Sequence, residues 1–348
     1  MGLFASLCAL VGCNAQNAAF KSVDVTEFEK IIADNNIVRL DVRTPEEYAE
    51  GHIDGAINID VKQTDFEKRA MALLPTGKTV ALYCRSGRRS KKAAQVLAAR
   101  GFDIVELESG IIGWNDAKRP VTTVETDIFA TPGGKLVRID AIKHGTLSIN
   151  FDGKWIYIDP VTTAVKPVTD YSTMPRADII LITHEHGDHL DANAVRQLAK
   201  DGTRLVANAN CATALKGVTD ATVMANGDSL TVGDVKIDAV PAYNTGADKQ
   251  QFHPRGRDNG FVLTIDGMRI YIAGDTENIP EMADINGIDV AFLPCNLPYT
   301  MTPEQVANAA RIVKPKVLFP YHYAQTDIKR VPELLKNDPI DVRIRQYK

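Results

Sequence analysis

Residues 183–189 read Thr183-His184-Glu185-His186-Gly187-Asp188-His189, and this stretch decides the fold of the C-terminal half. It contains three of the seven histidines in a chain of 348 residues. The preceding residues 179–182 are apolar and mostly β-branched, which predicts a buried strand. The histidines therefore stand where a strand ends and a loop begins. Because neutral imidazole and carboxylate are ligands that zinc and similar metals prefer, the stretch predicts a metal site.

The spacing within this stretch distinguishes two kinds of metalloenzyme. A zincin needs His-Glu-x-x-His on a helix, and Asp188 occupies the position of its second histidine. The pattern that remains, His-x-His-x-Asp-His, resembles the metallo-β-lactamase superfamily. This resemblance implies that His184 and His186 hold one metal, while Asp188 and His189 hold a second.

Two later strand ends carry further candidate ligands. Asp275 follows a strand predicted at residues 269–273, and His322 follows a strand predicted from Lys316. The same resemblance implies that Asp275 bridges the two metals and that His322 completes the second site. Zinc is the expected ion, as one or two per chain, with manganese or iron as alternatives.

One ligand of the first metal is left open by the sequence. Members of the superfamily place a histidine shortly after a Pro-Ala pair, whereas here Asn244 follows residues 241–243, Pro-Ala-Tyr. Because asparagine is a poor zinc ligand, His253 in the next loop is a candidate replacement or a substrate contact. His144, at the start of a predicted strand, is a candidate for either a structural or a substrate-binding role.

Residues 137–348 combine hairpins with helices. Asp152-Gly153 and Asp266-Gly267 predict tight hairpin turns, and the pattern predicts helices at residues 192–199 and 303–313. Two sheets sandwiched between helices fit this mixture. The resemblance accordingly implies an αββα sandwich of the metallo-β-lactamase type.

Finer features of this half indicate a reaction class. The Pro-Ala-Tyr-Asn segment and residues 296–301 most resemble the branch of ascorbate-phosphate lactonases and lipid phosphodiesterases. That resemblance implies hydrolysis of an ester, a lactone or a phosphodiester by a metal-activated water. Asp188 would then act as a catalytic group, and together with Asp275 it would orient the water and move its proton.

The N-terminal half alternates strand and helix patterns. Strands are predicted at residues 37–42, 79–83 and 104–107, and helices are predicted from Thr44 and over residues 89–100. Such alternation predicts an α/β fold, a parallel sheet with helices on both faces. No transmembrane segment is predicted in this half or in the other, because no apolar run is long enough.

Cys84 lies between a predicted strand and a predicted helix, where open parallel sheets place ligand sites. A helix N-terminus and nearby arginines favour a thiolate over a thiol, and successive backbone N–H groups form an anion cradle. Residues 41–48, 51–58, 84–87 and 110–114 resemble the motifs of single-domain rhodaneses. The resemblance implies that Cys84 carries a sulfane sulfur as a persulfide. The pocket would be lined by the rest of the loop, Arg85, Ser86, Gly87, Arg88 and Arg89.

The loop length separates this domain from phosphatases of the same fold, which resemble Cys-x5-Arg. Arg89 follows Cys84 after four residues, which suits a single sulfur atom better than a phosphate. We place the rhodanese-like domain at residues 20–121 and a linker at 122–136. The metallo-β-lactamase-like hydrolase domain then occupies residues 137–348.

The first nineteen residues resemble a bacterial lipoprotein signal. A short apolar run ends in Leu10-Val11-Gly12-Cys13, which looks like a lipobox. This implies lipidation of Cys13, a location in the cell envelope, and membrane attachment through the lipid anchor only. A cytoplasmic location is the alternative, because no Lys or Arg precedes the apolar run.

Composition argues against nucleic-acid binding and against a disulfide-stabilised fold. The net charge of −4 and the lack of a basic stripe argue against nucleic-acid binding. Five scattered cysteines do not form a disulfide framework. The expected partners are small-molecule substrates, including a sulfane-sulfur donor, and the sequence leaves the oligomeric state open.

The two halves together predict a bifunctional enzyme, a sulfurtransferase fused to a metal-dependent hydrolase. A first alternative is a persulfide dioxygenase with a single iron, because such enzymes share the lactamase fold and occur fused to rhodanese domains. A second alternative is that one domain serves as a non-catalytic binding module, which predicts a degenerate site. The presence of Cys84 and of the complete His184 cluster disfavours that alternative.

Overall fold

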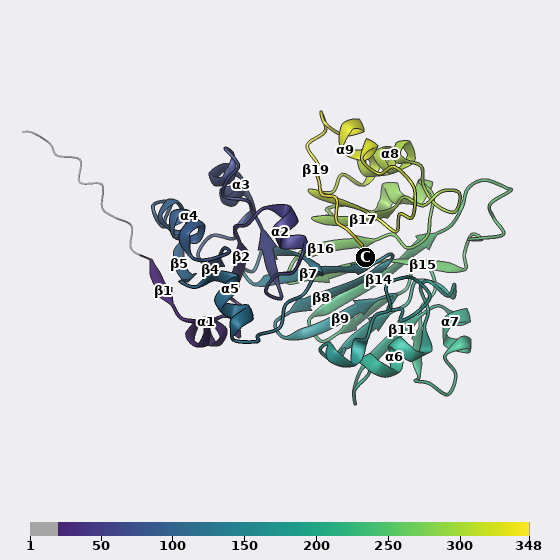
Figure 1. Ribbon diagram of the computed structural model, residues 1–348. Coiled ribbons are helices and arrows are strands. Elements are labelled where there is room, and N and C mark those ends of the chain that lie inside the picture. Colours follow the sequence, from purple (N-terminus) through teal and green to yellow (C-terminus); the bar gives the residue numbers. More distant parts are fainter. Residues whose placement is uncertain (1–19, 348) are drawn as a thin grey trace, which may run out of the picture. The chain divides into compact units, whose positions relative to one another are not determined.

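The computed structural model describes residues 20–347, which form two compact units (Figure 1). The first unit holds the described residues up to Glu47 together with Asn58–Ala72 and Thr76–Arg119, and the second holds the remainder. The predicted signal segment and Cys13 lie outside the described residues. Within residues 20–347, no helix combines the length and the apolar character that crossing a membrane requires.

The N-terminal sheet is parallel and has five strands in the order β1-β5-β4-β2-β3. Its strands are β1 (Lys21–Val23), β2 (Val38–Asp41), β3 (Ala56–Asn58), β4 (Thr79–Tyr83) and β5 (Asp103–Leu107). Its helices are α1 (Val25–Ile32), α2 (Pro45–Ala49), α3 (Phe66–Leu73), α4 (Arg88–Ala98) and α5 (Gly110–Asp116). Figure 1 shows α1 and α4 on opposite faces of this sheet, which confirms the predicted α/β architecture.

Local sequence signals explain where these elements begin. Residues 80–83 of β4 are all buried, as a central strand covered on both faces requires. Helix α2 begins with a capping box: the Glu47 amide donates to the Thr44 hydroxyl at 3.3 Å, and the Thr44 amide donates to the Glu47 carboxylate at 3.2 Å. These bonds satisfy amide groups that the first helical turn leaves without partners.

The second unit is a sandwich of two sheets with seven strands each. The first sheet, in the order β12-β11-β10-β9-β8-β7-β6, contains β6 (Glu125–Ala130), β7 (Leu136–Lys143), β8 (Thr146–Phe151), β9 (Lys154–Ile158), β10 (Ile179–Leu181), β11 (Arg204–Ala207) and β12 (Ala221–Val223). The second sheet, in the order β13 to β19, contains β13 (Ser229–Val232), β14 (Val235–Ala242), β15 (Asp258–Ile265), β16 (Met268–Ile272), β17 (Val290–Pro294), β18 (Val317–Tyr321) and β19 (Asp341–Val342).

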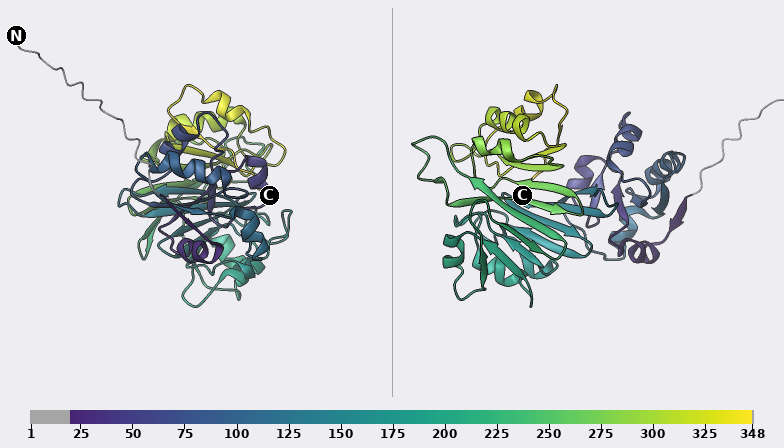
Figure 2. Two further views of the ribbon diagram at one scale, coloured as in Figure 1. Left: turned by 60° about the vertical axis from the view of Figure 1, so that its left-hand side comes forward. Right: turned by 180° about the vertical axis from the view of Figure 1, so that it is seen from behind.

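Helices cover the outer faces of this sandwich. They are α6 (Ala192–Leu198), α7 (Ala209–Ala214), α8 (Pro303–Val313) and α9 (Arg330–Leu334), with two short 3₁₀ turns, η1 (Tyr171–Thr173) and η2 (Pro280–Asp284). Figures 1 and 2 show α6 and α7 beside the first sheet and α8 and α9 beside the second. The predicted αββα sandwich is therefore confirmed.

The core of the sandwich lies between its two sheets. Ile149 and Ile158 of the first sheet belong to the same buried cluster as Ile272, Phe292 and Phe319 of the second. The rings of Phe292 and Phe319 stack with their centroids 4.9 Å apart. This continuous apolar layer fixes the two sheets against each other, so the loops at their shared edge are held in a defined arrangement.

Both predicted Asp-Gly hairpins are confirmed. Asp152 and Gly153 join β8 to β9 with φ values of 52° and 78°, and Asp266 and Gly267 join β15 to β16 with φ values of 46° and 81°. Two successive residues with positive φ are characteristic of the type I′ turn, whose twist matches that of the flanking strands.

The segment predicted as a linker, residues 122–136, contains a strand. Strand β6 pairs antiparallel with β7 and forms the edge of the first sheet. Two of its polar residues, Thr126 and Asp127, are buried and have partners elsewhere in the second unit. The Thr126 hydroxyl donates to Asp140 at 2.7 Å, and Asp127 accepts from Arg343 at 2.8 Å and from Arg345 at 2.7 Å. The Thr131-Pro132-Gly133-Gly134 run forms the connection between the two strands, where the Thr131 amide donates to the Lys135 carbonyl at 2.9 Å.

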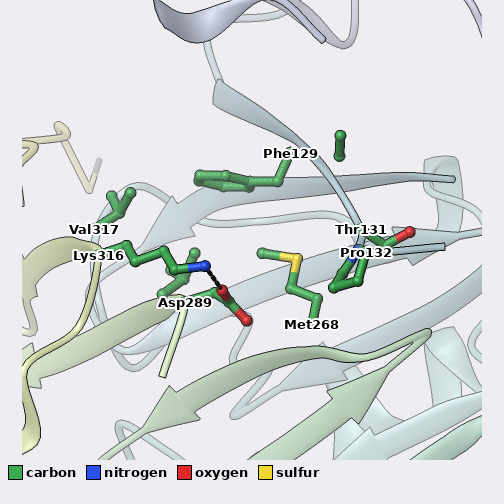
Figure 3. A pocket seen from close by; sticks show the side chains of 9 residues that line it. Phe129, Thr131, Pro132, Met268, Asp289, Lys316 and Val317 are labelled. Carbon is green, nitrogen blue, oxygen red and sulfur yellow. Dashed lines mark ion pairs between the residues drawn. The ribbon is translucent and has the colours of Figure 1, made fainter. Parts of the chain in front are cut away.

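A pocket of about 300 Å³ lies where β16, β17 and β18 begin (Figure 3). Its lining is mostly apolar, with Phe129, Pro132 and Met268 facing it, and an ion pair of 2.7 Å joins Lys316 to Asp289 at its edge. Since these strands run parallel, the pocket lies at the opposite end of the sheet from the side chains that follow the strands. It is therefore separate from the predicted metal site.

Candidate metal centre and cysteine loop

The predicted ligands meet at one edge of the sandwich. The loop that carries His184, His186 and His189 follows β10 of the first sheet. Asp275 follows β16, and His322 follows β18, both in the second sheet. Because the sheets present the carboxyl ends of these strands to a common edge, residues distant in sequence become neighbours in space.

One group of potential ligands contains three imidazoles. His184, His186 and His253 each offer a nitrogen atom, and these atoms lie within 4.8 Å of one another. His184 Nε2 and His186 Nδ1 are 3.1 Å apart. His253 comes from the loop between β14 and β15 and is 2% exposed. Of the two candidates for the remaining ligand of the first metal, Asn244 and His253, it is therefore His253 that lies beside His184 and His186.

Asn244 is not a member of any potential ligand group among the described residues. Its side-chain amide donates to the Tyr299 carbonyl at 2.8 Å, and its backbone amide donates to the His253 carbonyl at 2.9 Å. Asn244 therefore supports the loop that presents His253.

Two further groups adjoin the first. One contains His144, Asp188 and His322, and the other contains His184, His189 and Asp275. His189 Nε2 and His322 Nε2 are 2.9 Å apart, and each lies 3.5 Å from Asp275 Oδ1. His144, whose role the sequence left open, places its Nε2 at 3.2 Å from Asp188 Oδ2.

The electrostatics of these groups fit a divalent cation. Asp275 Oδ1 is buried and has no hydrogen-bond partner in the described part of the chain. Two imidazole nitrogens as close as those of His189 and His322 repel each other unless a proton or a metal lies between them. A set of neutral imidazoles and carboxylates is the donor set that zinc and related ions take.

The pKa shifts agree with this fit. Burial lowers the pKa of His184 well below its ordinary value, and the neighbouring histidines lower it further, which keeps the ring in its neutral, metal-binding form. Burial also opposes ionisation of Asp275, but His322, His189 and His253 outweigh it and lower the pKa of that carboxyl. Burial would lower the pKa of His189, but Asp275 and Asp159 raise it to about 10, because these carboxylates favour a positive charge at this position.

Asp159, which directly follows β9, orients two of the imidazoles. One of its oxygens lies 2.8 Å from His189 Nδ1 and accepts from the Thr183 hydroxyl at 2.6 Å. That hydroxyl lies 2.9 Å from His184 Nδ1. Sequence reasoning missed Asp159, although its position at a strand end is the signal that identified Asp275.

Asp258 orients the third imidazole of the first group. Its Oδ2 lies 3.0 Å from His253 Nδ1, which directs His253 Nε2 toward Asp275 at 3.4 Å. The same carboxylate accepts from Arg257 Nε at 2.6 Å. Sequence reasoning also missed Asp258, because it is the first residue of a strand and has no motif around it.

We expect the substitution Asp258→Asn to weaken metal binding by about 10–100-fold, because a ligand imidazole loses the carboxylate that fixes its orientation. Competition with a chelating dye measures this affinity. The exposed turn residue Asp234, which pairs with Lys154 far from the ligand groups, provides the matched control Asp234→Asn. Equal affinities for the two variants would contradict the assigned role of Asp258.

The Cys84 loop lies between β4 and α4 as predicted. Cys84 is 1% exposed, while Arg85, Ser86 and Arg88 are exposed. Gly87 adopts a φ of 89° at the helix N-cap. The loop is closed from the other side by α5, whose Ile111 amide donates to the Cys84 carbonyl at 2.9 Å.

Arg89, which we expected to line the pocket, forms an ion pair within the first unit. Its guanidinium donates two hydrogen bonds to Glu47, at 2.6 and 2.7 Å. The bonds from Arg89 lower the pKa of the Glu47 carboxyl to about 2. Arg89 therefore joins α4 to α2.

Comparison with known proteins assigns both halves. Residues 138–322 match the β-lactamase superfamily domain, and residues 24–117 match the rhodanese-like domain. The chain is 34% identical over 196 residues to the UPF0173 metal-dependent hydrolase of Thermococcus onnurineus. The match covers 54% of this chain and 85% of that protein.

Two solved structures are similar to the second unit. A protein of Parabacteroides distasonis, assigned as a metal-dependent hydrolase, is 50% identical with a TM-score of 0.61, and the match covers 65% of this chain and 100% of that chain. Igni18, a metallo hydrolase of Ignicoccus hospitalis, is 25% identical with a TM-score of 0.52, and the match covers 61% of this chain and 95% of that chain.

Proposed function

Because the chain belongs to the metallo-β-lactamase superfamily, among the UPF0173 metal-dependent hydrolases, and carries an N-terminal rhodanese-like domain, we propose that it combines two activities. The second unit hydrolyses an ester, a lactone or a phosphodiester with the help of a divalent metal, with zinc as the expected ion. The first unit transfers sulfane sulfur through Cys84. The observation that carries the hydrolase proposal is the convergence of imidazoles and carboxylates from both sheets on one edge.

The residues of the centre suggest two ligand sets. His184, His186 and His253 form one potential ligand group and would hold one ion. Asp188, His189 and His322 would hold another, since Asp188 Oδ2 lies 3.9 Å from His189 Nε2 and 3.5 Å from His322 Nε2. Asp275 lies within 3.5 Å of His189, His253 and His322 and could serve either set. A bound divalent ion supplies a water of lowered pKa and polarises the substrate oxygen under attack.

Asp188 is the carboxylate of the centre that meets solvent. Its side chain is 37% exposed, whereas that of Asp275 is 4% exposed. Hydrogen bonds from His144 and His322 outweigh the effect of burial and lower the pKa of Asp188, so it is ionised and can accept a hydrogen bond. Asp188 would therefore orient the attacking water through such a bond, while Asp275 remains a ligand.

The single-iron dioxygenase alternative requires one ligand set. The group formed by His144, Asp188 and His322 adds a second set beside the imidazoles of His184 and His186, and this favours hydrolysis. Elemental analysis of the purified protein, combined with a screen of ester, lactone and phosphodiester substrates, tests the proposal. Iron content with oxygen consumption on glutathione persulfide would instead support the dioxygenase.

The proposed lipid anchor at Cys13 rests on the lipobox of the sequence. We expect the mature protein to begin at Cys13 and to carry the mass of a diacylglyceryl group and a fatty acid. Mass spectrometry of the N-terminal peptide from the native host measures this, and an unmodified Met1 would refute the proposed anchor.

A further inference from the structure

A buried carboxylate lies behind the Cys84 loop. Glu106 of β5 has a fully buried side chain. Its Oε1 accepts a hydrogen bond from Ser90 Oγ at 2.6 Å, and its Oε2 accepts one from Ser22 Oγ at 2.6 Å. Both donors are neutral hydroxyls, so these bonds leave the negative charge of Glu106 uncompensated. A buried ionised carboxylate without a cationic partner is costly and calls for a reason.

Ser90 connects this carboxylate to the sulfur of Cys84. Ser90 Oγ lies 2.6 Å from Glu106 Oε1, 3.3 Å from Cys84 Sγ and 2.9 Å from the Gly87 carbonyl oxygen. A hydroxyl has one hydrogen, and the carboxylate at the shortest distance is the strongest acceptor for it. The lone pairs of Ser90 Oγ are then available to the Cys84 thiol, which can donate its own hydrogen to them.

The other charged groups near the loop are paired or exposed. In each of two ion pairs the opposite charges compensate each other. Arg89 pairs with Glu47 at 2.6 Å, and Arg43 pairs with Asp41 at 2.6 Å. Arg85 and Arg88 are exposed to solvent. Glu106 is therefore the carboxylate that hydrogen bonds link to the sulfur.

We propose that Glu106 accepts the proton of the Cys84 thiol through Ser90 during sulfur transfer, and returns it when the cysteine is regenerated. Ser90 contacts the reacting sulfur, and Glu106 acts through Ser90 as a positioning residue that stores the proton. This inference rests on the sulfurtransferase activity proposed above. It deepens that proposal by assigning the route of the proton.

The transfer balances in atoms and electrons. The thiol proton moves to Ser90 Oγ while the Ser90 hydroxyl proton moves to Glu106 Oε1. The Cys84 thiolate attacks the sulfane sulfur of thiosulfate, an S–S bond forms, and sulfite leaves with the electron pair of the broken bond. When cyanide takes the outer sulfur as thiocyanate, the electron pair of the S–S bond returns to Cys84, and the stored proton returns from Glu106.

The physical advantage of this route is a constant charge in the buried pocket. Cys84 and Glu106 are both buried, so a thiolate beside an ionised Glu106 would place two negative charges close together where solvent screens them little. Transfer of the proton within the hydrogen-bonded chain leaves one negative charge, first on the carboxylate and then on the sulfur.

The test compares the full-length wild type with Glu106→Gln, Ser90→Ala, the double variant and the conservative Glu106→Asp. Two rates are measured between pH 5 and 9: thiosulfate–cyanide sulfur transfer, and alkylation of Cys84 by iodoacetamide followed by mass spectrometry. Glu108→Gln is the matched control, because Glu108 lies two residues further along the chain and is exposed.

We expect both wild-type rates to change little between pH 5 and 7, because the proton acceptor is internal. In Glu106→Gln the proton must leave to solvent, so the rates should fall by about tenfold per pH unit below the range in which ordinary thiols ionise. Ser90→Ala should behave in the same way, and the double variant should be no slower than either single variant, because the residues act as one path. Glu106→Asp should restore a shallow pH profile.

Two outcomes would overturn the inference. Glu106→Gln and Ser90→Ala with wild-type pH profiles would show that neither residue handles the proton. Faster alkylation of Glu106→Gln at low pH would show that the carboxylate only repels the thiolate. If wild-type protein transfers no sulfur but its alkylation profile still depends on Glu106, the proposed function fails while the proton path stands. Ser90→Ala retains the carboxylate, so it decides the question even if Glu106→Gln does not fold.

Discussion

Replacement of His253 by alanine is expected to remove about one equivalent of metal and to abolish most of the hydrolase activity. His253 supplies the third imidazole of the group that contains His184 and His186, and two ligands are too few for a stable zinc site. The loss in affinity should exceed the roughly 10–100-fold loss that follows removal of a ligand's hydrogen-bond partner. Elemental analysis and kcat/KM on the substrate found by the screen measure both effects.

Asn244→Ala is the matched control for this experiment. Asn244 contributes no atom to the ligand groups of the described residues, so the variant should keep its metal apart from a modest effect of the lost bond to Tyr299. A double variant, His253→Ala with Asn244→His, places a histidine where many members of the superfamily have one and should recover part of the metal. Metal loss in Asn244→Ala with full retention in His253→Ala would show that the ligand had been assigned to the wrong loop.

Replacement of Cys84 by serine is expected to reduce thiosulfate–cyanide sulfur transfer by roughly 10³-fold or more, because the reaction loses the atom that carries the sulfur. Metal content and hydrolase activity should stay within about twofold of wild type, since Cys84 belongs to the other unit and to no potential ligand group of the described residues, and effects at sites that share no partners are independent. Thiocyanate formation and elemental analysis on the same preparation measure the two activities independently.

Cys295→Ala serves as the control for Cys84→Ser. Cys295 lies in the second unit, and burial raises the pKa of its thiol to about 12, so it is inert as a nucleophile. Sulfur transfer at the wild-type rate in Cys84→Ser would remove the basis of the sulfurtransferase proposal.

The structure brings together the residues that the sequence placed at the ends of buried strands. His184, His186, Asp275 and His322 each follow a short apolar run, and the parallel strands bring them to one edge. The sequence could not decide between Asn244 and His253, because the choice depends on how the loop between β14 and β15 folds back. That fold depends on bonds such as the one from the Asn244 amide to the His253 carbonyl.

Groups that act through other side chains were the ones that the sequence missed. Asp159, Asp258 and Glu106 gain their importance from a partner that is distant in sequence or reached through a hydroxyl. The pairing of Arg89 with Glu47 could not be predicted either, because it depends on the packing of two helices. Strand β6 lies within the segment predicted as a linker, and the sequence did not indicate it because its polar residues Thr126 and Asp127 have partners elsewhere in the chain.

The ligands of the metal centre come from both layers of the sandwich. His184 and His189 are carried by the first sheet, whereas Asp275 and His322 are carried by the second. A bound ion would therefore cross-link the two sheets. It would close long loops of the chain, as a disulfide does. Loss of the ion would make the loops at this edge more mobile, while the apolar core between the sheets would stay packed. One metal centre would therefore contribute both to the reaction and to the stability of the sandwich.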